Sequence, residues 1–148
     1  MRLYLDVDGT LLRRGGHARL KGEMAPAEHL KDFLEWVTRA FDCVWLTSRN
    51  RSGGHGGIRE VFRQAYGPGH DADAVDQLVT AIRPSVWATC KAEAIDFDED
   101  FLWLDDAPEE PSLDLLQEHG AMDRWIAISV DRKPDDLVRI KQILGRRG

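Results

Sequence analysis

The feature that most constrains this chain is a series of short apolar runs, each followed by acidic or hydroxyl residues. The runs are apolar nearly throughout instead of alternating with polar residues, and they cover residues 3–7, 43–46, 101–104 and 125–130. Strands of this kind are buried on both faces, as in parallel sheets whose two faces are covered by helices. The sequence therefore predicts an α/β fold with a mostly parallel sheet and helices on both sides.

Amphipathic segments fill the intervals between these runs, as this fold class requires. Apolar residues recur at helical spacing over residues 30–41, 58–66, 75–82, 113–119 and 134–144. Pro26 is expected to open the first of these helices, and Gly67 to end the second. The basic, glycine-containing stretch 13–21 predicts a loop or a small hairpin.

Composition narrows the classes of protein to consider. A chain of 148 residues with 43% hydrophobic residues suits a single domain spanning residues 1–148. The net charge of −6 argues against a general nucleic-acid binder. No long apolar segment suggests a signal peptide or a membrane partner. Cys43 and Cys90 lie in or beside apolar runs and are expected to be buried free thiols, which fits a cytoplasmic protein.

Chemically active side chains follow the predicted strands. Asp6, Thr47, Asp105 and Asp106 fall at or just beyond the ends of apolar runs, so a parallel sheet would bring them to one edge. A carboxylate such as Asp6 can attack phosphorus as a nucleophile. A second carboxylate can protonate the leaving oxygen and later deprotonate the attacking water, and Asp8 suits that role.

The same group of residues suits a divalent cation. Mg²⁺ prefers oxygen ligands, which Asp6, Asp105 and Asp106 can supply. The hydroxyl of Thr47 and the ammonium of Lys91 would then hold the phosphoryl oxygens. The sequence thus predicts a magnesium-dependent phosphohydrolase acting through an aspartyl-phosphate intermediate.

These residues resemble the motifs of the haloacid dehalogenase (HAD) superfamily over roughly residues 2–130. The successive motifs match Leu5-Asp6-Val7-Asp8-Gly9-Thr10, Trp45-Leu46-Thr47, Lys91 and Leu102-Trp103-Leu104-Asp105-Asp106. The resemblance implies a Rossmann-like, HAD-like sheet with Asp6 as nucleophile and Asp8 as acid and base. It also implies that Mg²⁺ binds the backbone carbonyl of Asp8. Residues 44–48 and 101–106 look most like small HAD domains associated with RNA-repair proteins.

The spacing of the motifs also bears on the substrate. The intervals between Asp6, Thr47 and Lys91 leave no room for a large cap domain. We therefore expect substrate recognition by loops, through Ser48 and Arg49 and through a basic rim formed by Arg13, Arg14, Arg19, Lys21, Arg49 and Arg51. Such a rim favours a terminal phosphate on a nucleotide or nucleic-acid end. The alternative is that these basic residues are an ordinary solvated surface.

Other interpretations remain open. Asp8 argues against a halide- or phosphonate-cleaving relative, and the order of the motifs argues against a phosphorylation-dependent receiver. The chain can also be a catalytically retired domain that binds phosphate or a partner. Residue by residue, Thr47 can be a helix cap, Lys91 a surface lysine, and the pair Asp105-Asp106 a cap for the helix that follows.

Overall fold

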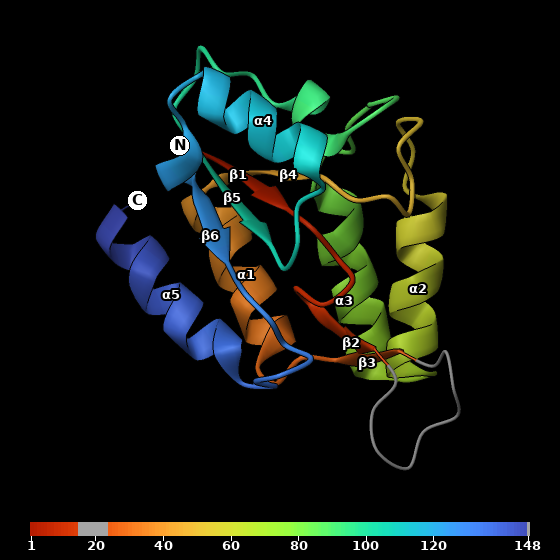
Figure 1. Ribbon diagram of the computed structural model, residues 1–148. Helices are drawn as coiled ribbons and strands as arrows, with labels where there is room; N and C mark the ends of the chain where they lie inside the picture. Colours follow the sequence, from red (N-terminus) through yellow and green to blue (C-terminus); the bar gives the residue numbers. More distant parts are fainter. Residues whose placement is uncertain (15–23, 148) are drawn as a thin grey trace.

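A four-stranded parallel sheet forms the centre of the protein. The computed structural model describes residues 1–14 and 24–147. The strands β1 (Arg2–Leu5), β4 (Asp42–Trp45), β5 (Phe101–Asp105) and β6 (Trp125–Ala127) lie in the order β4-β1-β5-β6 (Figure 1). All neighbours in this sheet pair in parallel. The predicted α/β class with a Rossmann-like parallel sheet is therefore confirmed.

The first and last strands are shorter than their apolar runs. Strand β1 ends at Leu5, because the Val7 carbonyl accepts hydrogen bonds from the backbone N–H groups of Thr10, Leu11 and Leu12 at 3.2, 2.9 and 3.1 Å. This turn needs Gly9, whose φ of 76° lies in the left-handed region. The turn places Asp6 immediately after the strand. Strand β6 likewise ends at Ala127, short of the predicted end at residue 130.

The helices expected from periodicity are present. They are α1 (Leu30–Ala40), α2 (Gly56–Tyr66), α3 (His70–Ala81), α4 (Glu110–Glu118) and α5 (Asp136–Arg147), with short 3-10 helices η1 (Lys91–Ala94) and η2 (Met122–Arg124). Within the described ranges, none of the helices combines the length and apolar character that crossing a bilayer requires.

The expected start of the first helix was wrong. Pro26 does not open α1 but ends strand β3 (Met24–Pro26), which pairs antiparallel with β2 (Leu12–Arg14). Proline can occupy this position because a two-stranded ribbon consists of edge strands, in which a missing N–H donor is tolerated. Of the basic stretch 13–21, for which a loop or small hairpin was expected, Arg13 and Arg14 belong to β2, and residues 15–21 lie outside the described part.

Alternate side chains of the sheet enter two separate clusters. Leu3 and Leu5 of β1 pack with α1, α2, α3 and α5, whereas Tyr4 packs with η1 and α4. Figure 1 shows α4 on one side of the sheet and α1 and α5 on the other. Cys43 and Cys90 are both buried free thiols, as predicted.

The strand order also fixes where a ligand can bind. From β1 the chain passes first to its neighbour β4 and later to its other neighbour β5. The carboxyl ends of β1 and β5 therefore flank a topological switch point, the usual ligand site of such sheets.

The loop after β6 is tied to α5 through Asp136, a buried residue. Its carboxylate accepts hydrogen bonds from Arg139 Nε at 2.8 Å and Nη2 at 2.9 Å, and from the Ser129 backbone N–H at 3.3 Å. The hydrogen bond from Arg139 lowers the pKa of Asp136, although burial opposes it.

We predict that Asp136→Asn destabilises the protein by about 1–3 kcal/mol at neutral pH. A carboxyl whose folded pKa is lowered adds stability above its unfolded pKa of about 4 and loses it as the pH falls through the folded value. The difference between wild type and variant in urea unfolding should thus be largest at pH 7 and shrink steadily below pH 4. A difference independent of pH would contradict this role for the charge.

Candidate active site

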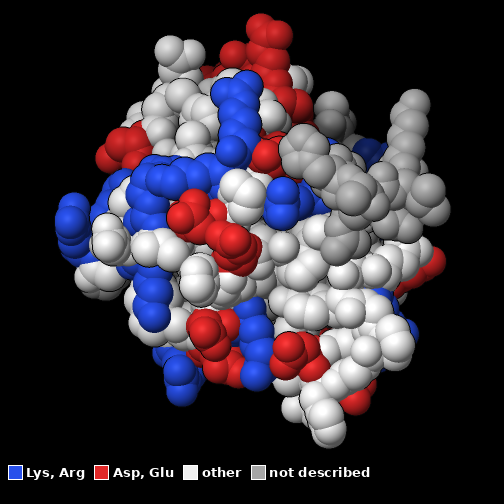
Figure 2. All heavy atoms as spheres, turned by 90° about the horizontal axis from the view of Figure 1, so that it is seen from below, with Lys and Arg blue, Asp and Glu red and all other residues white. Residues whose placement is uncertain are grey.

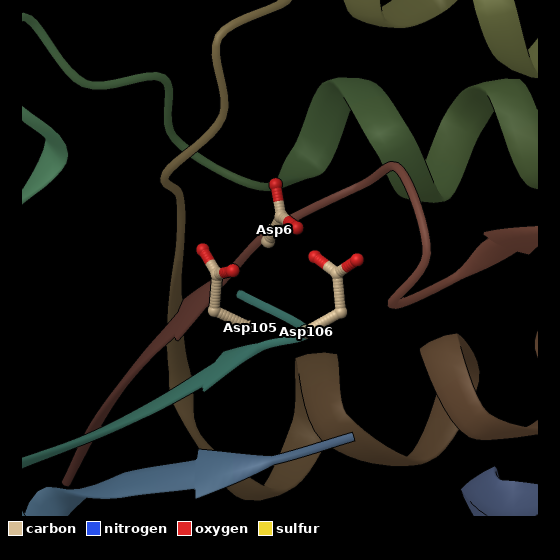
Figure 3. A group of neighbouring side chains, drawn as sticks. All are labelled: Asp6, Asp105 and Asp106. Atoms are coloured by element: carbon tan, nitrogen blue, oxygen red, sulfur yellow. The ribbon is translucent and has the colours of Figure 1, made fainter. Parts of the chain in front are cut away.

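Three carboxylates from two neighbouring strands converge at the switch point. Asp6 follows β1, Asp105 ends β5 and Asp106 comes next, and one oxygen from each lies within 4.8 Å of the others (Figure 3). Asp6 and Asp105 are buried, whereas Asp106 is partly exposed. The structure thus brings together the acids that the sequence placed at strand ends. Asp6 is almost fully buried, with an exposed fraction of only 4%.

Lys91 lies between two of these acids. Its Nζ donates to Asp6 Oδ1 at 3.1 Å and to Asp105 Oδ2 at 2.8 Å. Burial alone lowers the pKa of Lys91, but the charges of Asp6 and Asp105 outweigh it and raise the pKa above its ordinary value. Lys91 is therefore an ammonium inside the acidic group and not a solvated surface lysine.

Contacts from α4 hold the backbone around Lys91. The Ala92 N–H donates to Ser112 Oγ at 2.9 Å, and the Lys91 N–H donates to Glu109 Oε1 at 3.3 Å. Ser112 Oγ also donates to Glu109. Glu109 and Ser112 were not identified from the sequence, because the short helix η1 owes its position to residues that are distant in the chain.

The buried acids are costly to ionise together. Burial is the main cause that raises the pKa of Asp6, and the negative charge of Asp105 raises it further. Burial also raises the pKa of Asp105, against the opposing effect of Lys91. Thr10 stabilises the Asp6 carboxylate by donating from Oγ1 to Oδ2 at 3.0 Å. One ammonium shared by two buried carboxylates leaves negative charge unbalanced.

A second ion pair lies beside this group. Arg49 donates to both oxygens of Asp8, from Nε at 2.9 Å and from Nη2 at 2.6 Å. The loop that carries Arg49 is set by the Arg49 N–H, which donates to Thr47 Oγ1 at 3.1 Å. Gly57 is required next to this loop, because a Cβ there would lie 2.3 Å from the Arg49 carbonyl oxygen. The glycine-rich stretch thus lets α2 begin against the loop after β4.

Arg14 contacts the opposite side of the acidic group. Its Nη1 lies 3.0 Å from Asp106 Oδ2 and 2.9 Å from Asp131 Oδ2, and its Nη2 donates to the Asp8 carbonyl oxygen at 3.2 Å. The sequence predicted a substrate-facing rim residue here. Asp131 was not identified as a site residue, although it follows an apolar run just as Asp105 does.

Among the described residues, Arg13, Ser48 and Arg51 were also predicted to contact the substrate, and none of them is bonded to these acids. Neighbouring residues in a strand face opposite ways, so Arg13 faces away from Arg14, and its buried Nε has no hydrogen-bond partner among the described residues. Ser48 is exposed, and Arg51 stacks over Trp87 with Cζ 5.3 Å from the ring centroid. Arg19 and Lys21 lie outside the described residues.

The surface view in Figure 2 shows no continuous basic rim formed by described residues on the face that it draws. On the face drawn in Figure 2, Lys and Arg side chains are interspersed with Asp and Glu side chains. The expected basic rim is therefore reduced, among the described residues, to Arg14 and Arg49. Both are held by acids of the site itself, because an isolated guanidinium next to so many carboxylates finds a partner there.

The acidic group has the charge and spacing to hold a divalent cation. Five carboxylates face three cationic groups, namely Asp6, Asp8, Asp105, Asp106 and Asp131 against Lys91, Arg14 and Arg49. With all eight groups ionised, two negative charges would remain unbalanced, which a divalent cation would offset. Mg²⁺ prefers oxygen ligands, and the three acids each offer one carboxylate oxygen within 4.8 Å of the others. The residues present therefore fit this ion.

An apolar hollow of about 560 Å³ lies between α1 and α5. Phe33, Trp36, Leu137 and Lys141 are among its lining residues, and none of the acids described above lines it. Reactive groups and perturbed pKa values gather at the sheet edge instead, which is the better indicator of a reaction site.

Comparison with known proteins finds no protein-family model that matches the chain and no curated protein with significant similarity to it.

The pKa shifts predict an unusual effect of Asp6→Asn on stability. A carboxyl whose folded pKa is raised opposes folding once the pH exceeds its unfolded value of about 4, and the cost is complete above the folded value. Asn can keep both contacts, with its oxygen toward Lys91 and its amide donating to Thr10. We therefore expect Asp6→Asn to raise the melting temperature in chelator at pH 8, and the gain to disappear toward pH 4.

The matched control is Asp8→Asn. The Asp8 carboxylate is partly exposed and already paired with Arg49, so its removal should not stabilise the protein. Equal melting temperatures for wild type and Asp6→Asn across this pH range would show that the Asp6 carboxylate carries no electrostatic cost.

Proposed function

We propose that this protein is a magnesium-dependent phosphomonoester hydrolase of the HAD type. The observation that carries the proposal is the buried Lys91 ammonium, which joins Asp6 to Asp105 next to Asp106. A carboxylate nucleophile held next to a cation and further acids, which can bind a metal, suits nucleophilic attack on phosphorus. The order of the motifs along the chain gives independent support.

In the first step of the proposed reaction, an oxygen of Asp6 attacks the phosphorus of the substrate. The bond between phosphorus and the leaving oxygen breaks, and Asp8 transfers a proton to that oxygen. In the second step, Asp8 takes a proton from water while the water oxygen attacks phosphorus. The bond to Asp6 then breaks, which releases inorganic phosphate and restores the Asp6 carboxylate and the protonated Asp8 with which the cycle began.

Asp6, Asp105, Asp106 and the backbone carbonyl of Asp8 would hold the magnesium ion. When bound, Mg²⁺ supplies positive charge that offsets the repulsion between the Asp6 carboxylate and an anionic phosphate. Lys91 keeps Asp6 in place and neutralises part of the same charge. The buried hydroxyl of Thr47 is close to Arg49 and would help to hold the phosphoryl group.

Arg49 links substrate binding to the acid and base function of Asp8. While both Asp8 oxygens accept hydrogen bonds from Arg49, a proton on Asp8 would compete with the guanidinium. Phosphoryl oxygens are equally good partners for a guanidinium fork. We infer that the substrate takes over Arg49, which releases Asp8 for proton transfer.

For the substrate, we propose a terminal phosphate on a nucleotide or nucleic-acid end. Within the described residues, the intervals between the motifs are occupied by the β2–β3 hairpin and by α1, α2 and α3, not by a cap domain. A site without a cap admits a bulky substrate. A reducing cytoplasm suits a protein with the free thiols Cys43 and Cys90.

The proposal is tested by assaying the purified protein with Mg²⁺ on p-nitrophenyl phosphate and on oligonucleotides phosphorylated at either end. We expect turnover that stops in chelator and returns with added Mg²⁺. Asp6→Asn should lower kcat by at least about 10³-fold, because an amide cannot form the covalent intermediate. Turnover retained in Asp6→Asn, or undiminished in chelator, would contradict the mechanism.

The role of Asp8 makes a separate prediction. Asp8→Asn should slow the hydrolysis of an alkyl phosphate far more than that of p-nitrophenyl phosphate, whose leaving group needs no proton. With p-nitrophenyl phosphate a burst of nitrophenol should precede slow turnover, because the phosphorylated Asp6 accumulates. Equal defects on both substrates without a burst would assign Asp8 a structural role.

A further inference from the structure

Arg14 reaches acidic and carbonyl oxygens that come from three different loops. Its guanidinium contacts Asp106 Oδ2, Asp131 Oδ2 and the carbonyl oxygen of Asp8 at 3.0, 2.9 and 3.2 Å. Its own backbone N–H donates to Asp131 Oδ1 at 2.6 Å. These contacts use neither Asp6 nor Lys91.

The space around these oxygens is tight. A Cβ on Gly9 would lie 2.2 Å from Asp106 Oδ2 and 2.8 Å from Arg14 Nη1. Gly9 therefore lets the turn after β1 approach both side chains. The Val130 N–H donates to the Gly9 carbonyl oxygen at 2.9 Å, which holds the loop carrying Asp131 against the same turn.

Two of the three groups that contact Arg14, the Asp106 carboxylate and the Asp8 carbonyl, also belong to the proposed magnesium site. A guanidinium and a metal ion cannot both occupy the same side of these oxygens. The third partner, Asp131, is outside the proposed ligand set.

We propose that Arg14 is a tethered counter-ion of the metal-free site, which releases Asp106 and the Asp8 carbonyl to an arriving divalent cation and stays paired with Asp131. This inference rests on the metal site of the proposed function. Half of the Arg14 side chain is exposed, so it can shift without unpacking the core. Asp131 affects metal binding only through Arg14, because the guanidinium stays paired with Asp131 after it has left Asp106 and the Asp8 carbonyl.

The test measures Mn²⁺ affinity by electron paramagnetic resonance of the free ion, with chelator-stripped protein and no substrate. Arg14→Gln should tighten Mn²⁺ binding about five- to tenfold. The variant lacks the guanidinium, whose charge-assisted hydrogen bonds compete with the metal ion for Asp106 and the Asp8 carbonyl. Arg49→Gln removes the same charge nearby without freeing a carboxylate of the Asp6, Asp105 and Asp106 group. It should tighten binding only about twofold.

A double-mutant cycle separates competition from plain electrostatics. Asp131→Asn should weaken Mn²⁺ binding, because Arg14 is then left with Asp106 as its charged partner, while the Asn oxygen can still accept from the Arg14 N–H. When Arg14 is already Gln, the same Asp131 change should have little effect. A direct charge effect of Asp131 would instead be additive, and additivity would overturn the inference.

The outcomes also distinguish this inference from the proposed function. Wild-type binding of Mn²⁺ with equal gains in Arg14→Gln and Arg49→Gln would refute the role of Arg14 and leave the metal site standing. No binding by wild type or by Arg14→Gln would refute both. If Arg14→Gln does not fold, Arg14→Lys replaces it. Lys keeps the charge but cannot reach the three oxygens as a planar fork, so Mn²⁺ binding should still tighten.

Discussion

The ion pair network of Lys91 with Asp6 and Asp105 is the interaction on which the rest of the site depends. Two carboxylates buried side by side cannot both be ionised without a nearby cation. Lys91 supplies one positive charge at 3.1 and 2.8 Å. Because two carboxylates share that charge, the negative charge at this edge of the sheet is only partly neutralised, which is the basis of the proposed metal site.

The strand order determines which loops reach this edge of the sheet. Strand β1 is central, and its two neighbours bring in the loops after β4 and β5. Ser112 of α4 accepts a hydrogen bond from the backbone N–H of Ala92, next to Lys91, while Asp136 fixes the loop after β6 that carries Asp131. The acids are thus held by β1, by β5 and by the loop after β6, which keep them close together despite their charge repulsion.

Two arginines complete the charge balance from outside. Arg49 is hydrogen-bonded to Asp8, the carboxylate proposed for proton transfer. Arg14 is hydrogen-bonded to Asp106, one of the proposed metal ligands. Both are partly exposed and both lie on loops or short strands, so they are the parts of the site that can move at low cost. In this picture substrate and metal each displace one arginine, and the protein without them keeps its carboxylates paired.

The sequence by itself determined the alternation of strands and helices and the presence of Asp6, Asp105 and Asp106 at one edge, because apolar runs and strand ends are local patterns. It did not determine where Pro26 acts or which way the basic residues face. Arg13 and Arg14 are adjacent and chemically alike, and only strand pairing sends one away from the acids and the other onto Asp106 and Asp131. Such partners lie far apart in the chain, so tertiary structure alone could decide them.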